Sequence, residues 1–377
     1  MTELQDIFAQ YGESYRLNHR LLSNQLKVMR AIEVCRTSSL GGHVDTCDEC
    51  GFMRISYNSC RNRHCPKCQT LNKERWIEAR KDDLLNISYF HVVFTIPDLL
   101  NPVAYQNQKV IYDVLFKAAA ETLSELAADK KYLGAQIGFT AILHTWGQNL
   151  THHPHLHCIV TGGGLNSCGK WVNTRRKFFI PVKVLSKKFK GKFLYYLKQV
   201  KIEFHGSISY LQDPFKLRDW MSSLYQKEWV VYCKPPFKNA GYVVEYLGRY
   251  THRVAISNHR IVKLEDGIVT FKWRDYKDSN KQKEMKVTAD EFIRRFLIHV
   301  LPNGFTRIRH YGVLSPRNKA TKLKLCKKLT NTKLNDTPKS KLSTLDLLKK
   351  ITGKDFTICP YCGVGHLSRA SPVQVIA

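Results

Sequence analysis

Paired cysteines constrain the fold of this chain more than any other feature. Cys47 with Cys50, and Cys65 with Cys68, frame the stretch "CDECGFMRISYNSCRNRHCPKC". Four thiolates in two Cys-x2-Cys pairs can surround one zinc ion tetrahedrally. Four more potential ligands occur close by, and we assign them to a second site: Cys35, His43, Cys60 and His64. We therefore expect one or two structural zinc ions in a small amino-terminal domain.

Some of these residues also fit simpler interpretations. A cysteine outside a pair is usually a small buried residue, which is the alternative for Cys35 and Cys60. The stretch "CPYCGVGH" at residues 359–366 supplies half of a zinc ribbon, which could complete a site or form a plain turn. Arg61 and Arg63, inside the zinc stretch, would give its surface the positive charge that contacts DNA phosphates.

The charge balance predicts a polyanionic partner. The 377 residues include 60 Lys and Arg against 31 Asp and Glu, a formal net charge of +29. Nucleic acid is the first candidate and an anionic membrane surface is the alternative. The sequence shows neither an apolar run that would span a bilayer nor a secretory signal at its start, so we expect no membrane association. The 12 cysteines then indicate metal ligands or free thiols in the cytoplasm, not disulfides.

Short strands and mixed connections predict an α+β fold behind a small helical, zinc-binding domain. Helical patterns and strand patterns both occur, and we expect helices at residues 3–34, 69–86, 101–128, 183–203 and 239–253, and strands at residues 89–97, 136–148, 153–164 and 261–275. The expected domains are residues 1–85, 86–315 and 316–377. The last of these is rich in lysine, and we expect a weakly folded basic extension there.

A run of histidines, "THHPHLHCIV" at residues 151–160, lies in one of the predicted strands. Alternate residues of a strand share a face, so His155 and His157 would point the same way and could bind a divalent ion. If the preceding hairpin turns near residues 151 and 152, Gln148 faces His155 and is the third ligand. His144 and His153 are the alternatives, because the register is an assumption. A histidine-rich hairpin without an ion is the other interpretation.

Two tyrosines stand four residues apart in "YVVEYLGRYTHR", residues 242–253. A helix would place Tyr246 and Tyr250 on one face. A tyrosine oxygen can attack a phosphodiester and hold the DNA covalently, while Arg249 and Arg253 hold neighbouring phosphates. The alternative is an aromatic stripe in the core, which Tyr242 would extend.

Together these segments resemble one family. The motifs "NSCRNRHCPKCQ", "YFHVVFTIP", "HTWGQNLTHHPHLHCIVTGGGL" and "YLGRYTHRVAISNHRI" occur in the order found in transposases of the insertion sequence 91 family. The resemblance covers about residues 10–315 and implies a two-tyrosine member of the His–hydrophobic–His endonuclease superfamily. It also implies an antiparallel sheet flanked by helices. It implies that His155 and His157 are the metal pair, that Tyr246 and Tyr250 are the nucleophiles, and that Gln148 occupies the third ligand position.

The resemblance also implies an activity. A transposase of this kind would bind Mg²⁺ or Mn²⁺, cleave single-stranded DNA at transposon ends through 5′-phosphotyrosine intermediates, and transfer the strand by a rolling-circle route. One alternative is a replication initiator or relaxase with the same chemistry. Another is a non-catalytic, zinc-dependent nucleic-acid-binding protein. The sequence does not indicate an oligomeric state.

Overall fold

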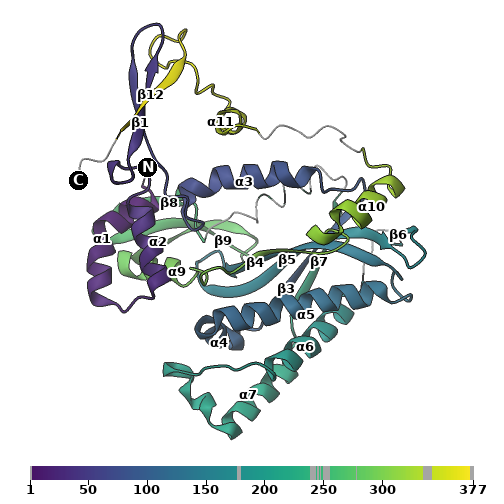
Figure 1. Ribbon diagram of the computed structural model, residues 1–377. Coiled ribbons are helices and arrows are strands. Elements are labelled where there is room, and N and C mark those ends of the chain that lie inside the picture. The colour runs from purple at the N-terminus through teal and green to yellow at the C-terminus, as the bar shows by residue number, and fades with distance from the viewer. Residues whose placement is uncertain are drawn as a thin grey trace.

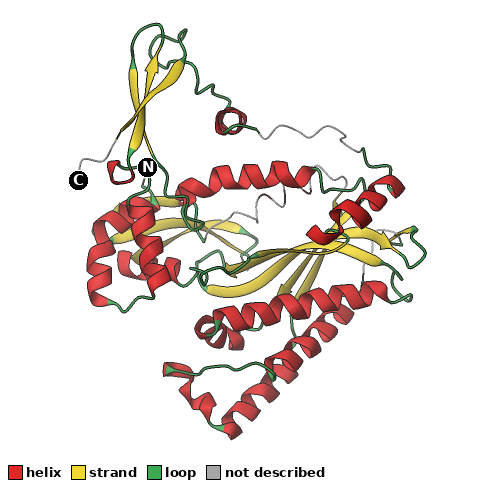
Figure 2. Cartoon of the chain, in the orientation of Figure 1, coloured by secondary structure: helices red, strands yellow, loops and turns green. Residues whose placement is uncertain are grey.

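The computed structural model describes residues 2–175, 180–237, 255–276, 278–333 and 342–373, together with Val243, Tyr246 and Gly248. It shows the predicted α+β fold, with antiparallel sheets flanked by helices (Figure 2). No helix within these described ranges has the length and apolar character needed to cross a bilayer.

A six-stranded antiparallel sheet forms the centre of the molecule, with strand order β11-β4-β5-β3-β7 and β6 paired to β5. Its strands are β3 (Tyr89–Thr95), β4 (Gln136–Trp146), β5 (His152–Leu165), β6 (Trp171–Asn173), β7 (Val231–Phe237) and β11 (Ile308–Gly312). The strand expected at residues 89–97 is confirmed as β3. The two strands expected next in the chain are confirmed as the hairpin β4–β5.

Helices cover both faces of this sheet (Figure 1). On one face lie α4 (Asn101–Gln106), α5 (Gln108–Ala128) and α6 (Val182–Leu197), with α7 (Pro214–Gln226) beyond α6. Phe90, Val92 and Phe94 alternate along β3 and point into this apolar layer. On the other face lies α3 (Pro66–Lys81), above the residues of β3 that alternate with these, including Tyr89 and His91.

A second layer joins the amino-terminal helices to a later part of the chain. The helix expected at residues 3–34 is split into α1 (Leu4–Asn18) and α2 (Ser23–Glu33). These pack on α9 (Ala289–Leu297) and on a sheet of β8 (Ile261–Glu265), β9 (Ile268–Asp275) and β10 (Lys281–Thr288). Asp266 and Gly267 form the turn that joins β8 to β9, and both residues have positive φ, as a tight hairpin turn requires.

A small third sheet, with strand order β12-β1-β2, pairs an amino-terminal hairpin with the last described strand of the chain. It consists of β1 (Gly42–Cys47), β2 (Met53–Tyr57) and β12 (Leu367–Val373). Between the central sheet and β12 the chain forms α10 (Lys324–Leu329) and α11 (Thr344–Thr352). The described part of the expected extension therefore contains helices and a strand. It buries Leu323, Cys326 and Leu347, while Leu342 and Leu345 are exposed.

Candidate functional site

Three imidazoles converge on the α3 face of the central sheet. His144 comes from β4, and His155 and His157 come from β5, where the strand alternation places both on one face. Their ring nitrogens lie within 4.8 Å of one another, and Nε2 of His155 is 3.1 Å from Nε2 of His157. The predicted pair is therefore brought together, with a third histidine beside it.

The third member is His144, where we expected Gln148. The hairpin turns at residues 147–151, with the Gly147 N–H donating to the Thr151 carbonyl at 3.0 Å, and this register pairs His144 with His155 across the strands. Gln148 lies in the turn itself, and its amide donates to the Tyr276 hydroxyl at 2.9 Å. The turn lies a few residues earlier in the chain than expected. Gln148 is therefore part of the turn and does not face His155.

The protonation of this cluster suits a cation. Burial lowers the pKa of His155 to about 4, so the ring is neutral at pH 7. Its Nδ1–H donates to the His153 carbonyl at 2.7 Å, which leaves the Nε2 lone pair facing the cluster. His144 and His157 are also buried. Three imidazoles with converging nitrogens, two of them buried and one half-buried, fit a divalent transition-metal ion.

His91 connects this cluster to a tyrosine. Its Nε2 lies 2.8 Å from Nδ1 of His157, and its Nδ1 lies 3.0 Å from the hydroxyl of Tyr246. The ring is buried, and this burial lowers its pKa to about 3. His91 was not among the site residues expected from the sequence. The available signal was a single polar residue inside the apolar strand "YFHVVFT".

Tyr246 lies at the edge of an apolar cluster under α3, in contact with a group that includes Val243 and Trp76. Gly248, two residues on, lies so close to α3 that a Cβ atom there would be 2.3 Å from Cδ1 of Ile77. Tyr246 is only partly buried, and its hydroxyl bonds to His91, which a purely structural aromatic stripe would not require. The other predicted residues of this segment lie outside the described residues: Arg249, Tyr250 and Arg253.

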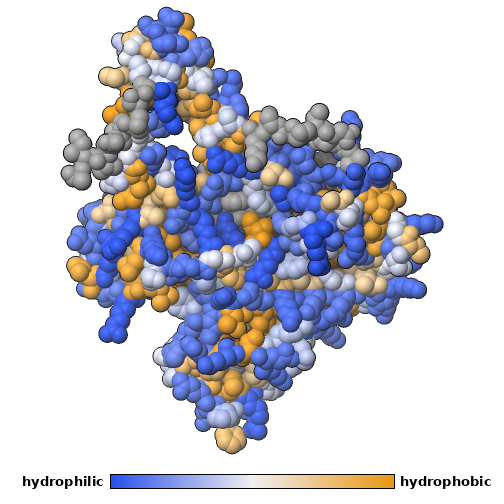
Figure 3. Space-filling model, in the orientation of Figure 1, coloured by the Kyte–Doolittle hydropathy of each residue, from blue (hydrophilic) through white to orange (hydrophobic). Residues whose placement is uncertain are grey.

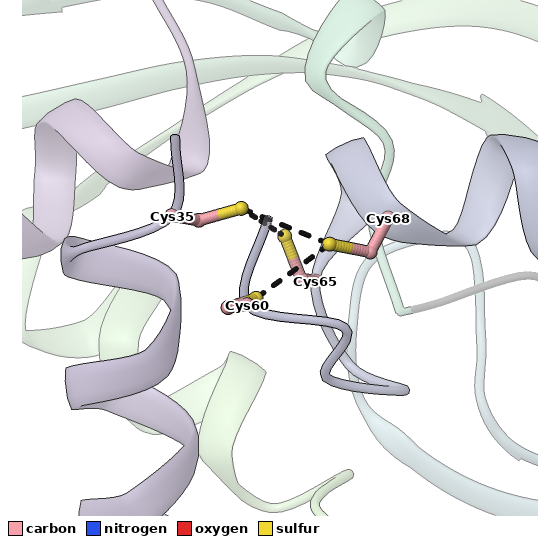
Figure 4. Close-up of side chains that lie close together, drawn as sticks. All are labelled: Cys35, Cys60, Cys65 and Cys68. Carbon is pink, nitrogen blue, oxygen red and sulfur yellow. Dashed lines mark hydrogen bonds between the residues drawn. The ribbon is translucent and has the colours of Figure 1, made fainter. Parts of the chain in front are cut away.

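The first of two cysteine clusters lies between α2 and α3 (Figure 4). It contains Cys35 after α2, Cys60 in the loop after β2, and Cys65 and Cys68 at the start of α3. Sulfur separations are 3.6 Å for Cys35–Cys65, 3.7 Å for Cys35–Cys68 and 3.6 Å for Cys60–Cys68. Zn–S bonds of about 2.3 Å in a tetrahedron require sulfur separations of about 3.8 Å, so the four thiols fit zinc.

The second cluster contains Cys47, Cys50, Cys359 and Cys362. The expected division of the ligands is therefore wrong. The β1–β2 hairpin carries Cys47 and Cys50 away from α3, toward the carboxyl-terminal cysteines.

The two predicted histidine ligands lie elsewhere. His43 accepts a hydrogen bond from Arg369 at 2.9 Å. His64 is buried, its Nε2 accepts from the Leu301 N–H at 3.4 Å, and burial lowers its pKa to about 3.

The two arginines of the zinc stretch differ in their surroundings. Arg61 is exposed. The Arg63 guanidinium donates to the carbonyls of Phe305 and Pro302 at 2.6 and 2.8 Å, and burial lowers its pKa. Arg63 therefore holds a loop of the second layer, and only Arg61 keeps the exposure that phosphate contact requires.

Two protein families match parts of this chain. Residues 7–96 match the family described as "Transposase zinc-binding domain", and residues 138–322 match the family described as "Putative transposase". The protein named "Putative transposase y4qJ" from Sinorhizobium fredii is 49% identical over 374 residues, covering 97% of this chain and 94% of the relative. The "Transposase for insertion sequence element IS801" from Pseudomonas savastanoi pv. phaseolicola is 28% identical over 305 residues, or 78% and 71% of the two chains. This chain therefore belongs to the insertion sequence 91 family of transposases and carries the amino-terminal zinc-binding domain of that family.

Proposed function

We propose that this transposase cleaves and rejoins single-stranded DNA at the ends of its insertion sequence, with Tyr246 and Tyr250 as nucleophiles. The observation that carries the proposal is the hydrogen-bonded path from the Tyr246 hydroxyl through His91 to His157. A tyrosine oxygen with this connection to a metal-binding cluster is arranged for phosphoryl transfer. The name of the relative that serves an insertion sequence element favours transposon ends over a replication or transfer origin.

The ion site would consist of His144, His155 and His157, which replaces the expected set with Gln148. A bound Mg²⁺ or Mn²⁺ ion would polarise the scissile phosphate and offset the charge on its oxygens. Imidazole nitrogens bind transition metals better than they bind Mg²⁺, so Mn²⁺ is favoured.

The ring protons of His157 and His91 support a role of Tyr246 as a nucleophile. Because Nε2 of His157 faces the cluster, we place its proton on Nδ1, where it donates to Nε2 of His91. The remaining proton of His91 is then on Nδ1 and donates to the Tyr246 oxygen. This hydrogen bond stabilises negative charge on that oxygen as its proton leaves, so His91 is a positioning residue for the nucleophile.

The covalent step exchanges one ester for another. The Tyr246 oxygen loses its proton and bonds to phosphorus, the bond from phosphorus to the 3′ oxygen breaks, and the 3′ oxygen takes up a proton. The products are a 5′-phosphotyrosine and a free 3′-hydroxyl. The phosphotyrosine conserves the energy of the phosphodiester, so rejoining needs no nucleotide. Tyr250 would allow a second cleavage before the first end is released.

A covalent adduct tests this function. The purified protein is incubated with Mn²⁺ and single-stranded oligonucleotides from the element's ends, and a protein–DNA adduct is detected on a denaturing gel. We expect the Tyr246→Phe, Tyr250→Phe double variant to form none. Tyr232→Phe, at an exposed tyrosine of β7, is the control and should react normally. An adduct that persists in the double variant contradicts the choice of nucleophiles. No adduct with any end sequence supports a DNA-binding role without cleavage.

A further inference from the structure

The second cysteine cluster joins residues that are far apart in the chain. Sγ of Cys47 lies 3.8 Å from Sγ of Cys362, and Sγ of Cys50 lies 3.8 Å from Sγ of Cys359. These are the separations of about 3.8 Å that a tetrahedral zinc ion imposes, and they are far beyond the roughly 2 Å of a disulfide. Cys359 and Cys362 lie outside the region that matches the family's zinc-binding domain, which ends at residue 96.

The two halves of this cluster have the same local structure. Gly51 follows Cys50 with φ +67°, and its N–H donates to the Cys47 carbonyl at 3.2 Å. Gly363 follows Cys362 with φ +73°, and its N–H donates to the Cys359 carbonyl at 3.0 Å. Each Cys-x2-Cys-Gly sequence thus forms a turn that ends in a left-handed glycine, which directs both sulfurs of the pair to one point.

Further contacts hold the halves together. The Gly365 N–H donates to Sγ of Cys362 at 3.3 Å, a bond that stabilises a thiolate. The Asp48 N–H donates to the His366 carbonyl at 3.1 Å, and the His366 N–H donates to the Asp48 carboxylate at 2.6 Å. Beyond these bonds, β1 pairs with β12 from Cys47, opposite Leu367.

This three-stranded unit has little apolar core. Among the described residues, none from 42–57 or 357–373 belongs to one of the hydrophobic clusters of the molecule. Large apolar side chains of the unit are instead exposed, including Met53, Ile55, Tyr361 and Val364. A unit this small without a core needs another source of stability, and a structural metal ion is a common one.

From this geometry we propose that Cys47, Cys50, Cys359 and Cys362 bind a second structural zinc ion, which fastens the carboxyl-terminal segment to the amino-terminal hairpin. The first ion would be held by the cluster of Cys35, Cys60, Cys65 and Cys68.

The second ion would also secure α11 over α3, since α11 is part of the segment that it fastens. The Arg75 guanidinium of α3 donates to the Thr344 hydroxyl of α11 at 2.6 Å, and Lys350 of α11 pairs with Glu78 of α3. The opposite side of α3 contacts Gly248, next to Tyr246. The ion would therefore hold the segment that contains α11 against α3, and α3 in turn packs near Tyr246.

Zinc content of the full-length chain tests the proposal without any DNA cleavage. Zinc is measured in a His155→Ala background, so that the histidine cluster adds no ion to the count. There we expect two zinc ions per chain, and one after Cys359→Ser and Cys362→Ser are added. The matched control, Cys168→Ser with Cys233→Ser in the same background, changes two cysteines outside both clusters and should keep two. Two ions with Cys359→Ser and Cys362→Ser present would overturn the proposal, as would a single ion in the His155→Ala chain without them.

Limited proteolysis provides a second measurement on the same variants. Loss of the ion should expose residues 342–373 to rapid cleavage while the central sheet stays protected. Unchanged protection of this segment in the double variant would also overturn the proposal. Because neither measurement involves DNA, a negative result here leaves the proposed cleavage chemistry intact, and a missing adduct leaves the zinc site intact.

Discussion

His144 reaches the histidine cluster because the β4–β5 hairpin turns at residues 147–151. We predict that His144→Ala slows Mn²⁺-dependent adduct formation by on the order of 100-fold, about 3 kcal/mol, since it removes one of three ligands. Gln148→Ala should change the rate less than about 2-fold, because its amide contacts Tyr276 in the turn. Rates measured with saturating DNA would compare the two. If Gln148→Ala slows adduct formation more than His144→Ala does, then Gln148 and not His144 is the third ligand.

His91 has partners on both sides, so its removal should affect both metal binding and the nucleophile. In His91→Ala the buried Nδ1–H of His157 loses its acceptor. We predict that half-maximal adduct formation then needs a roughly 10- to 100-fold higher Mn²⁺ concentration. The adduct should also form more slowly at saturating Mn²⁺, since the Tyr246 hydroxyl loses its donor.

The control for His91 is Tyr89→Phe, on the same face of the same strand, where the hydroxyl only accepts from the Leu85 N–H. This variant should be less stable without any change in the Mn²⁺ dependence. His91→Gln carries both a donor and an acceptor, and it should recover part of the loss. If His91→Ala and Tyr89→Phe behave alike in Mn²⁺ titrations, His91 is merely structural.

Helix α3 lies directly against Gly248, which ends the described part of the segment that carries Tyr246. A Cβ at residue 248 would lie 2.3 Å from Cδ1 of Ile77, so Gly248→Ala must displace the segment or the isoleucine. We predict roughly 10- to 100-fold slower adduct formation, because small displacements of a nucleophile are costly. Adding Ile77→Ala should recover much of the rate. Gly191→Ala on α6, where a Cβ has open space, is the control. Failure of Ile77→Ala to restore activity would refute this steric account.

The elements near the site show what the sequence could predict. Alternation along β5 put His155 and His157 on one face, because the two-residue period of a strand is a local property. The identity of the third ligand depended on the register of β4, and that register is fixed by distant contacts. His299, which follows α9, donates to the Leu150 carbonyl and accepts from the Thr145 hydroxyl, both at 3.1 Å. No pattern within residues 136–165 contains this information.

At the level of the whole molecule, contacts between distant parts of the chain also explain why the cysteines form other groups than the sequence predicted. The sequence indicated that paired cysteines would bind zinc, but the partner of Cys50 is Cys359, 309 positions away. Spacing rules choose nearby pairs, whereas the fold pairs β1 with β12, near the carboxyl-terminal end (Figure 1). The net charge of +29 predicted the partner more reliably, because a family of transposases acts on DNA. Hydrophilic residues also cover most of the face of the molecule in Figure 3.

Buried neutral histidines should make the stability of the whole fold sensitive to acid. Burial lowers the pKa of His64 and of His299 to about 3 each, against about 6.5 in an unfolded chain. Below pH 6.5 the unfolded state therefore binds protons that the folded state does not, and stability falls as the pH falls toward 3. Each residue should remove roughly 1 kcal/mol from the free energy of unfolding between about pH 7 and about pH 5.5.

Chemical denaturation at these two pH values measures that loss, and His299→Gln should reduce it by the share of one residue. The comparison with wild type cancels the acid sensitivity of the thiolate clusters, which both proteins share. His205→Gln, at an exposed imidazole, should leave the difference unchanged. If His299→Gln keeps the full wild-type difference, then His299 is not held neutral by its contacts with Thr145 and Leu150, and the acid sensitivity of the fold has another origin.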